Sequence, residues 1–245
     1  MGTQTIIIAT VFTHCSTKGK RSIHWPHVII IIPLLLVGCS RAHILKGNQQ
    51  PFMSDVKTMS DIKSDRQWMS GGAHQEIITV GDPLLRRQSE MVKDIGQATL
   101  LGERMASLLR ELKGAGLAAP QIGVSERIVV VEVRQTDLFP DRPESPLYVM
   151  INPAIVEASE DLEEWWEGCF SVPGLMGQVP RHKSITVQYT TPDASTHRET
   201  FNGYIARVIQ HEYDHLEGKI FLDRMTSTNS LTTVANYIRF HHKSL

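Results

Sequence analysis

Cysteine, excess charge and long hydrophobic runs are all scarce in this sequence. Its three cysteines, Cys15, Cys39 and Cys169, are an odd number spread over 245 residues, which provides no disulfide framework and favours a reducing compartment. The formal net charge is only −1, so we expect no broad basic surface and no bulk binding of nucleic acid. The composition is that of one globular domain with an appendage.

Residues 1–70 differ in pattern from the rest of the chain. Basic residues at 18–21 precede an apolar run at 28–37, and Gly38-Cys39 follows it. This is the layout of a secretion signal or a bacterial lipoprotein processing site, although the run is shorter than the roughly 20 residues of an ordinary membrane-spanning helix. The alternative is a translation start assigned too far upstream, because Met53, Met59 and Met69 follow the run. We expect residues 1–70 to be a poorly ordered N-terminal extension and residues 71–245 to be the folded domain.

Hydrophobic periodicity predicts the main elements of this domain. Apolar residues at helical spacing predict helices near 95–112, 203–216 and 231–240. Runs of β-branched residues and alternating patterns predict strands at 128–133, 148–151 and 184–189. Together these elements indicate an α+β fold with mixed or antiparallel β-sheets.

The strongest chemical signal is His211-Glu212-Tyr213-Asp214-His215. Two histidines four residues apart lie on one face of a helix, where both imidazoles can bind a single cation. A divalent metal lowers the pKa of a bound water, and an adjacent carboxylate such as Glu212 can accept its proton and pass it to a leaving group. The same pattern also arises by chance in ordinary helices, so alone it predicts only a candidate metal site.

A catalytic metal site usually needs a third protein ligand and keeps one position for water. Cys169, in a segment shaped by glycine and proline, is a candidate, although a lone cysteine is more often a small buried hydrophobe. The run of small residues at 114–123 contains Gln121 as its one neutral polar side chain. That run either lets the backbone approach another group closely or simply ends the preceding helix.

Three segments therefore carry these residues in a fixed order: Gly114-Ala115-Gly116-Leu117-Ala118-Ala119-Pro120-Gln121, then Glu167-Gly168-Cys169-Phe170-Ser171, then Gln210-His211-Glu212-Tyr213-Asp214-His215. Taken together they resemble the three motifs of the peptide deformylase family. The resemblance extends over about residues 77–225 and leaves out residues 1–70. It implies a fold with a central metal-binding helix, a catalytic domain at 71–245, and a metal-dependent hydrolase. The implied reaction removes the N-formyl group from the formylmethionine of newly made proteins and releases formate.

The resemblance also implies a role for each motif residue. Cys169, His211 and His215 would bind the metal, and a water would take the fourth position. The side-chain amide of Gln121 and the backbone N–H of Phe170 would donate hydrogen bonds to the formyl oxygen as it becomes an oxyanion. Glu212 would protonate the departing amine.

Substrate contacts follow from the same resemblance. The backbone of Gly114, Ala115 and Gly116 would pair with the extended peptide. Tyr204, Arg207 and Val208 would lie along one helix face near the first side chain and form a methionine pocket. Asp214 and Arg181 are candidates for orienting the metal-binding side chains, or else ordinary surface charges.

The cofactor and the cellular setting are less directly indicated. A cysteine with two histidines suits Fe²⁺, Zn²⁺, Ni²⁺ or Co²⁺, and the resemblance implies Fe²⁺. The expected partners are N-formylmethionyl nascent peptides and also the ribosome, which places the protein in the cytoplasm. Membrane association through residues 28–39 is the alternative.

Two other functions are compatible with parts of the sequence. A zinc endopeptidase would share the histidine motif but would take its third ligand from downstream, where His241 and His242 lie. A non-enzymatic peptide-binding module would use the metal only to stabilise its fold, which gives no role to Glu212 and Gln121.

Overall fold

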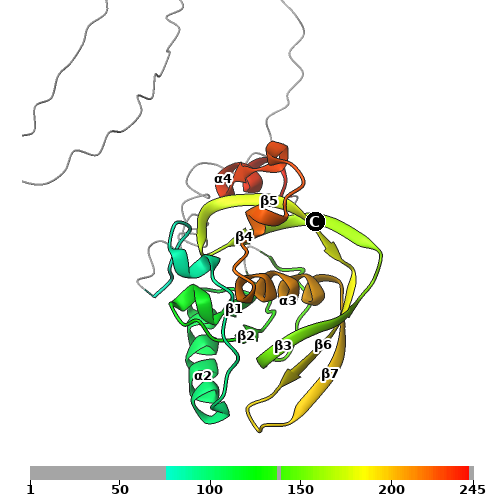
Figure 1. Ribbon diagram of the computed structural model, residues 1–245. Coiled ribbons are helices and arrows are strands. Elements are labelled where there is room, and N and C mark those ends of the chain that lie inside the picture. The colour runs from blue at the N-terminus through cyan, green and yellow to red at the C-terminus, as the bar shows by residue number, and fades with distance from the viewer. Residues whose placement is uncertain (1–75, 137–138, 243–245) are drawn as a thin grey trace, which may run out of the picture. The chain divides into compact units, whose positions relative to one another are not determined.

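The computed structural model describes residues 76–136 and 139–242. The N-terminal extension expected at 1–70, with its apolar run, lies outside the described residues. The described part contains two β-sheets, three α-helices and short 3₁₀ segments (Figure 1). None of its helices is long and apolar enough to cross a membrane.

The larger sheet has five strands in the order β1-β2-β3-β6-β7, and every neighbouring pair is antiparallel. β1 is therefore an edge strand. The bounds of these strands are β1 Gly116–Ala118, β2 Ile128–Val131, β3 Tyr148–Ala158, β6 Ser184–Thr190 and β7 Thr196–Asn202.

The smaller sheet has three strands, β4 (Leu162–Cys169), β5 (Val172–His182) and β8 (Thr232–Thr233), again antiparallel. β4 and β5 form a long hairpin in which Cys169 pairs with Val172. Phe170 and Ser171 are the two residues of its turn. The hairpin thus ends at the segment that carries the cysteine motif.

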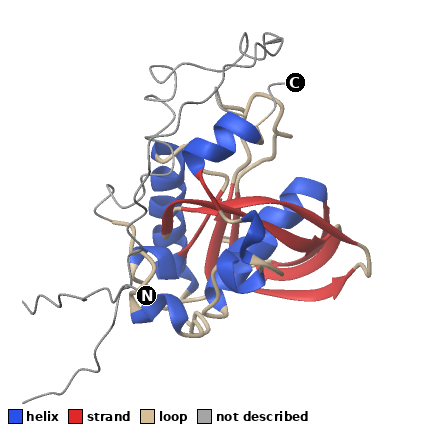
Figure 2. Cartoon of the chain, turned by 90° about the horizontal axis from the view of Figure 1, so that it is seen from above, coloured by secondary structure: helices blue, strands red, loops and turns tan. Residues whose placement is uncertain are grey.

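The five-stranded sheet is buried on both faces by helices. Ile128 and Val130 belong to the core that contains helix α2 (Ile95–Glu111), whereas Val129 and Val131 belong to the core that contains helix α3 (Gly203–Leu216). Successive strand residues point to opposite faces, and burial of both faces explains why β2 is apolar throughout. Figure 2 shows helices on both sides of the strands.

Helix α3 lies between the two sheets. It contacts β1, β2, β6 and β7 of the larger sheet and β5 of the smaller one, and ten of its fourteen residues are buried. A helix in this position presents its side chains to both sheets, so it can bring residues of one sheet to residues of the other. In Figure 1 it occupies the middle of the described part of the chain.

The predicted elements are largely confirmed. Helix α3 has the predicted bounds, α2 ends one residue early, and helix α4 covers Val234–Phe240 of the predicted 231–240. Of the predicted alternatives, mixed or antiparallel sheets, the antiparallel one is confirmed: all strand ladders among the described residues are antiparallel, and the only parallel pairing there is the isolated bridge between Glu90 and Glu126. The sequence analysis predicted none of the strands β1, β4, β5, β7 and β8.

Candidate metal centre and active site

Helix α3 and the end of β4 bring together the three predicted metal ligands. Ligand atoms of Cys169, His211 and His215 all lie within 4.8 Å of one another, and all three residues are buried. The Cys169 Sγ is 3.3 Å from His215 Nε2. The two imidazole centroids are 5.2 Å apart, as expected for residues one helical turn apart. Two histidines and one cysteine, converging on one point in a buried site, are a donor set that fits a divalent transition-metal ion.

The imidazole of His211 is oriented by Glu167, on the side of the ring that faces away from the cluster. Its Nδ1 lies 2.9 Å from a carboxylate oxygen of Glu167, and since the carboxylate can only accept, Nδ1–H is the donor. The other nitrogen, Nε2, is left to face the cluster. A carboxylate on the far nitrogen is the usual support for a metal-binding histidine.

Glu167 is itself held by two arginines. The Arg181 guanidinium donates to both of its oxygens at 2.9 Å, and Arg207 Nη1 donates to one of them, also at 2.9 Å. Arg181 Nη1 also donates a hydrogen bond to Asp214 Oδ2 at 2.5 Å, and Asp214 accepts further hydrogen bonds from Arg224. Arg181 and Asp214 are therefore buried ion-pair partners around the cluster rather than ordinary surface charges.

Arg207 lines the pocket, as the sequence analysis expected, but its guanidinium is engaged by protein groups. Besides Glu167, it donates to the backbone oxygens of Val179 and Glu163. Only 4% of its surface is exposed. The guanidinium thus links α3 to β4 and β5 beside the pocket.

The electrostatics of the cluster favour an ionised thiol. Burial raises the pKa of Cys169, but the attraction and hydrogen bonds of His215 and His211 outweigh it and lower the pKa to about 5. Burial lowers the pKa of His211, but Cys169 and Glu167 outweigh it and raise the pKa well above its ordinary value. The site therefore stabilises a thiolate, which is the form of cysteine that binds metals.

Glu212 lies beside the ligands on helix α3 and is itself buried. Burial raises its pKa to about 7, although His211 and His215 act in the opposite direction. Its Oε2 is buried without a hydrogen-bond partner among the described residues. A Cβ atom added to Gly116 would lie 2.6 Å from Glu212 Oε1 and 2.8 Å from Val208 Cγ1. Glycine is thus required for the close approach of β1 to the carboxylate.

Gln121 is fixed with its amide directed at the cysteine motif. Its Oε1 accepts from the backbone N–H of Ala118 at 2.8 Å, and its Nε2 lies 3.4 Å from both Cys169 Sγ and Ser171 Oγ. The accepted hydrogen bond determines which end of the amide faces the site. Phe170 follows Cys169 in the hairpin turn, and its ring touches the place where a Gly114 side chain would stand.

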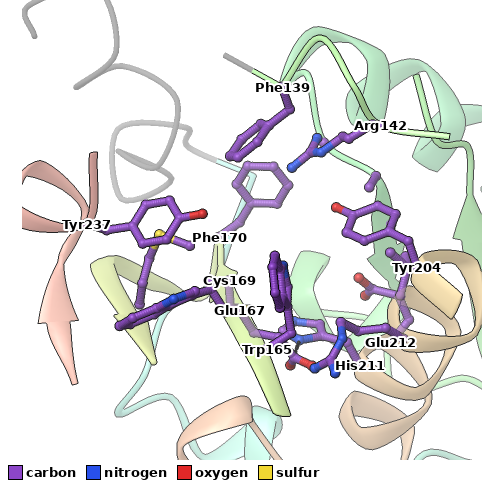
Figure 3. A pocket seen from close by; sticks show the side chains of 18 of the residues that line it. Phe139, Arg142, Trp165, Glu167, Cys169, Phe170, Tyr204, His211, Glu212 and Tyr237 are labelled. Carbon is purple, nitrogen blue, oxygen red and sulfur yellow. Dashed lines mark hydrogen bonds and ion pairs between the residues drawn. The ribbon is translucent and has the colours of Figure 1, made fainter. Parts of the chain in front are cut away.

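All predicted site residues except His215 line one pocket of about 710 Å³ (Figure 3), and His215 lies beside it in the ligand cluster. It contains the predicted substrate residues Gly114, Ala115, Gly116, Tyr204, Arg207 and Val208, together with Gln121, Cys169, Phe170, His211 and Glu212. The sequence analysis missed Trp165 and Trp166 of β4 and Tyr237 of α4, which also line it. His241 and His242 also line the pocket. They are not part of the cluster of possible metal ligands found among the described residues.

Comparisons with known proteins agree with this geometry. Residues 74–230 match the family model of polypeptide deformylases. The chain is 39% identical over 163 residues to peptide deformylase 2 of Nostoc sp., covering 66% of this chain and 91% of that protein. It is 40% identical over 147 residues to peptide deformylase 1 of Nitrosomonas europaea, covering 59% and 84%.

A solved structure is similar over the same region. The Met-Ala-Ser-bound class I type b peptide deformylase of Acinetobacter baumannii is 35% identical, with a TM-score of 0.59, and the match covers 61% of this chain and 96% of that one. Family match, relatives and solved structure all name the same kind of hydrolase, and the three motif segments meet in one pocket. The chain belongs to the peptide deformylase family and is an enzyme of that class.

Proposed function

We propose that this chain binds one divalent metal ion through Cys169, His211 and His215 and removes the formyl group from formylmethionyl peptides, releasing formate. The observation that carries the proposal is the convergence of the three ligand atoms within 4.8 Å, beside a buried carboxylate and a fixed amide. Helix α3 is then the central metal-binding helix of the fold.

A metal bound here would activate a water molecule and polarise the formyl oxygen. Fe²⁺ is our proposed ion in the cell, and Zn²⁺, Ni²⁺ and Co²⁺ suit the same donors. The chain contributes a thiolate and two imidazoles, of which that of His211 is oriented by Glu167. The Glu167 carboxylate holds a proton on Nδ1 of His211, which directs Nε2 toward the cluster, where a bound metal would take the place of a proton.

Glu212 transfers the proton. It accepts the proton from the attacking water and then gives it to the nitrogen of the departing amine. Burial raises its pKa to about 7, close to the working pH at which a group can both accept and donate. Its partner-free oxygen Oε2 leaves a site for the water or the amine.

Gln121 and the Phe170 backbone N–H stabilise the negative charge that develops on the formyl oxygen. The Gln121 amide already faces Cys169, and Phe170 is the next residue of the chain. Donors fixed before the reaction need no reorganisation as the charge forms, and each is worth roughly 10²–10³ in rate.

The peptide binds as an additional strand at the free edge of β1. β1 is an edge strand of the five-stranded sheet, and Gly114, Ala115 and Gly116 line the pocket at and just before it. An exposed strand edge offers backbone hydrogen bonds to an extended peptide. The first side chain then lies against Tyr204, Val208 and the stem of Arg207. The Met-Ala-Ser bound in the A. baumannii relative supports a substrate of this kind.

Nascent formylated chains are the natural substrates in this proposal, and they place the protein in the cytoplasm near ribosomes. Membrane association through residues 28–39 is the alternative, and that segment lies outside the described residues. Sequencing the N-terminus of the protein purified from its native source decides between them, because a processed or lipidated end at Cys39 would rule out the cytoplasmic assignment.

The direct test is formate release from formyl-Met-Ala, measured with metal content in the same preparations. We expect the wild-type protein to hold about one metal per chain and to release formate. Cys169→Ala should lose both, because two imidazoles alone hold a metal weakly. Cys169→Ala protein that keeps its metal would refute the ligand assignment and would revive the endopeptidase alternative. Glu164→Gln, an exposed change on the same strand, is the matched control.

A further inference from the structure

A short extended segment near the start of the described chain connects the two segments that carry the proposed oxyanion donors. We call this segment, residues 77–80, the strap. The Ile78 N–H donates a hydrogen bond to the backbone oxygen of Gln121 at 2.9 Å, and the Val80 N–H donates one to the backbone oxygen of Ser171 at 2.7 Å. Alternate residues of an extended chain direct their N–H groups to the same side, so one short segment can hold both.

The two donors come from different parts of the fold. Gln121 belongs to the 3₁₀ segment η3 (Ala119–Ile122), which directly follows β1 of the larger sheet, whereas Phe170 lies in the turn of the β4–β5 hairpin of the smaller sheet. One direct link between them is the Gln121 side chain, whose Nε2 is 3.4 Å from Cys169 Sγ and from Ser171 Oγ. For an oxygen acceptor this is longer than the usual distance of about 2.7–3.2 Å. The strap therefore supplies the shorter hydrogen bonds to both segments.

Packing fixes the strap to the same two segments. Ile77 is 6% exposed and belongs to one hydrophobic cluster with Phe170, Leu117 and Ala119. A buried side chain at the start of the strap thus holds it in the core that both donor segments enter. Val80, in contrast, is 47% exposed, so its link to the site is its backbone N–H and not its side chain.

If the proposed function holds, on which this inference rests, the strap has a role in catalysis. We propose that residues 77–80 position the oxyanion donors: the Val80 N–H holds the turn that carries Phe170, and the Ile78 N–H holds the segment that carries Gln121. Donors of this kind act mainly when charge develops on the formyl oxygen, so their alignment affects kcat more than KM. Ile78 and Val80 are positioning residues, because they act through protein groups and not on the substrate.

The local backbone allows one strap hydrogen bond to be removed alone. Residues 79–82 form a β-turn, in which the Asp82 N–H donates to the Thr79 oxygen at 3.0 Å. Gly81, at the third position, has a φ of 109°, and Val80, at the second, is not among the described non-glycine residues with positive φ. This is the pattern of a type II turn, which favours proline at its second position. Val80→Pro should therefore keep the turn and delete only the N–H. A proline with compatible φ also tends to stabilise a fold.

The first test measures kcat and KM for formyl-Met-Ala with the metal-loaded full-length protein. We expect Val80→Pro to lower kcat roughly tenfold to a hundredfold, the effect of a small misplacement in an active site, and to leave KM within a factor of about two. Metal content and the urea midpoint should stay near those of the wild type. Val80→Ala is the conservative variant, which keeps the N–H, and it should restore the kcat that the proline removes.

The second test removes the other strap hydrogen bond without constraining the chain. Placing the α-hydroxy acid analogue of isoleucine at Ile78 replaces the N–H that reaches Gln121 by an oxygen atom. This change should also lower kcat about tenfold or more, but in Gln121→Ala protein it should have less than about a twofold further effect, because the donor that it positions is gone. Equal factors in the two backgrounds would indicate a general weakening of the fold and would overturn the positioning role. This test also stands if Val80→Pro does not fold.

The outcomes separate this inference from the proposed function. A folded, metal-loaded Val80→Pro protein with the kcat of the wild type would overturn the strap alone, since formate release would still support deformylation. Loss of metal from Val80→Pro would also overturn it, because the strap would then act on the ligand Cys169 instead of the donors. Absence of formate release from the wild-type protein would overturn both.

Discussion

The two ends of the pocket are held in place by different forces. At the cluster end, Glu167 and Asp214 are buried beside Arg181 and Arg207, and hydrogen bonds of about 2.5–2.9 Å fix each side chain. At the other end, the aromatic end, rings contact rings at centroid distances of 4.6–5.9 Å; its rings belong to Phe139, Trp166, Tyr237, His241 and His242. Ion pairs in a buried site demand one geometry, whereas ring contacts tolerate several. The cluster end is thus the more sharply defined of the two, as chemistry that needs fixed atoms requires.

The largest effect expected at the cluster end is on catalysis. Glu212→Gln keeps the size of the side chain but cannot transfer a proton, so kcat for formyl-Met-Ala should fall roughly 10²–10⁴-fold. Metal content should stay near that of the wild type, because Glu212 is not among the three ligands. Steady-state kinetics and metal analysis of one preparation check this. Rates within a factor of about three of wild type would exclude Glu212 as the proton carrier.

Arg181→Met should give the largest loss of stability. It leaves the Glu167 and Asp214 carboxylates buried with fewer partners, and breaking a buried ion pair from one side costs about 3–5 kcal/mol. Arg198→Met is the matched control, because the Arg198–Glu157 pair is exposed and such pairs contribute about 0–1 kcal/mol. Urea unfolding measures both. Equal losses would mean that burial does not distinguish the two pairs.

Gly116→Ala should lower kcat, but by less than Glu212→Gln does, and should leave stability near that of the wild type. The added Cβ would stand 2.6 Å from Glu212 Oε1, so either the carboxylate or β1 must shift. A displacement of about 1 Å in an active site can cost roughly 10²-fold in rate. Gly96→Ala at the start of α2, where the nearest atom is 3.3 Å away, is the control. An unchanged kcat in Gly116→Ala would show that Glu212 tolerates displacement.

The pH dependence of stability should be the smallest effect. Burial raises the pKa of Glu167, but Arg181 and His211 outweigh it and hold the pKa below its ordinary value of 4.5. Asp214 behaves likewise through Arg224 and Arg181. A carboxylate with a depressed folded-state pKa stabilises the fold above its unfolded pKa and loses that contribution as pH falls below it. Unfolding free energy should therefore fall below about pH 4.5, and less steeply in Arg181→Met. A steeper fall in the variant would contradict this origin.

The sequence was most informative where a local pattern determines local structure. Helix α3 has the predicted bounds because apolar residues recur at helical spacing from its start to its end. β4 was missed because Glu163, Glu164 and Trp165 are exposed and do not follow the alternation of a half-buried strand. The ion-pair role of Arg207 could not be predicted, since its partner Glu167 lies 40 residues away and only the packing of α3 against β4 brings them together.

The aromatic end of the pocket could not be predicted from the sequence for a related reason. The helical pattern near 231–240 predicted a last helix, and α4 is there, but nothing in that pattern indicates what the helix covers. The answer depends on the pairing of β8 with β5, and β8 has only two residues, Thr232 and Thr233. A strand of that length has no periodicity to detect.

The two-residue turn after β4 has a consequence for inhibition and resistance. Cys169, a proposed metal ligand, and Phe170, whose N–H is a proposed oxyanion donor, are consecutive residues, and neighbouring Cα atoms stand about 3.8 Å apart. A compound that spans the ion and this N–H would therefore meet a spacing fixed by a peptide bond and by the Cys169–Val172 pairing. Substitutions elsewhere in the pocket could weaken the compound's other contacts, but they could not change this spacing without opening the hairpin.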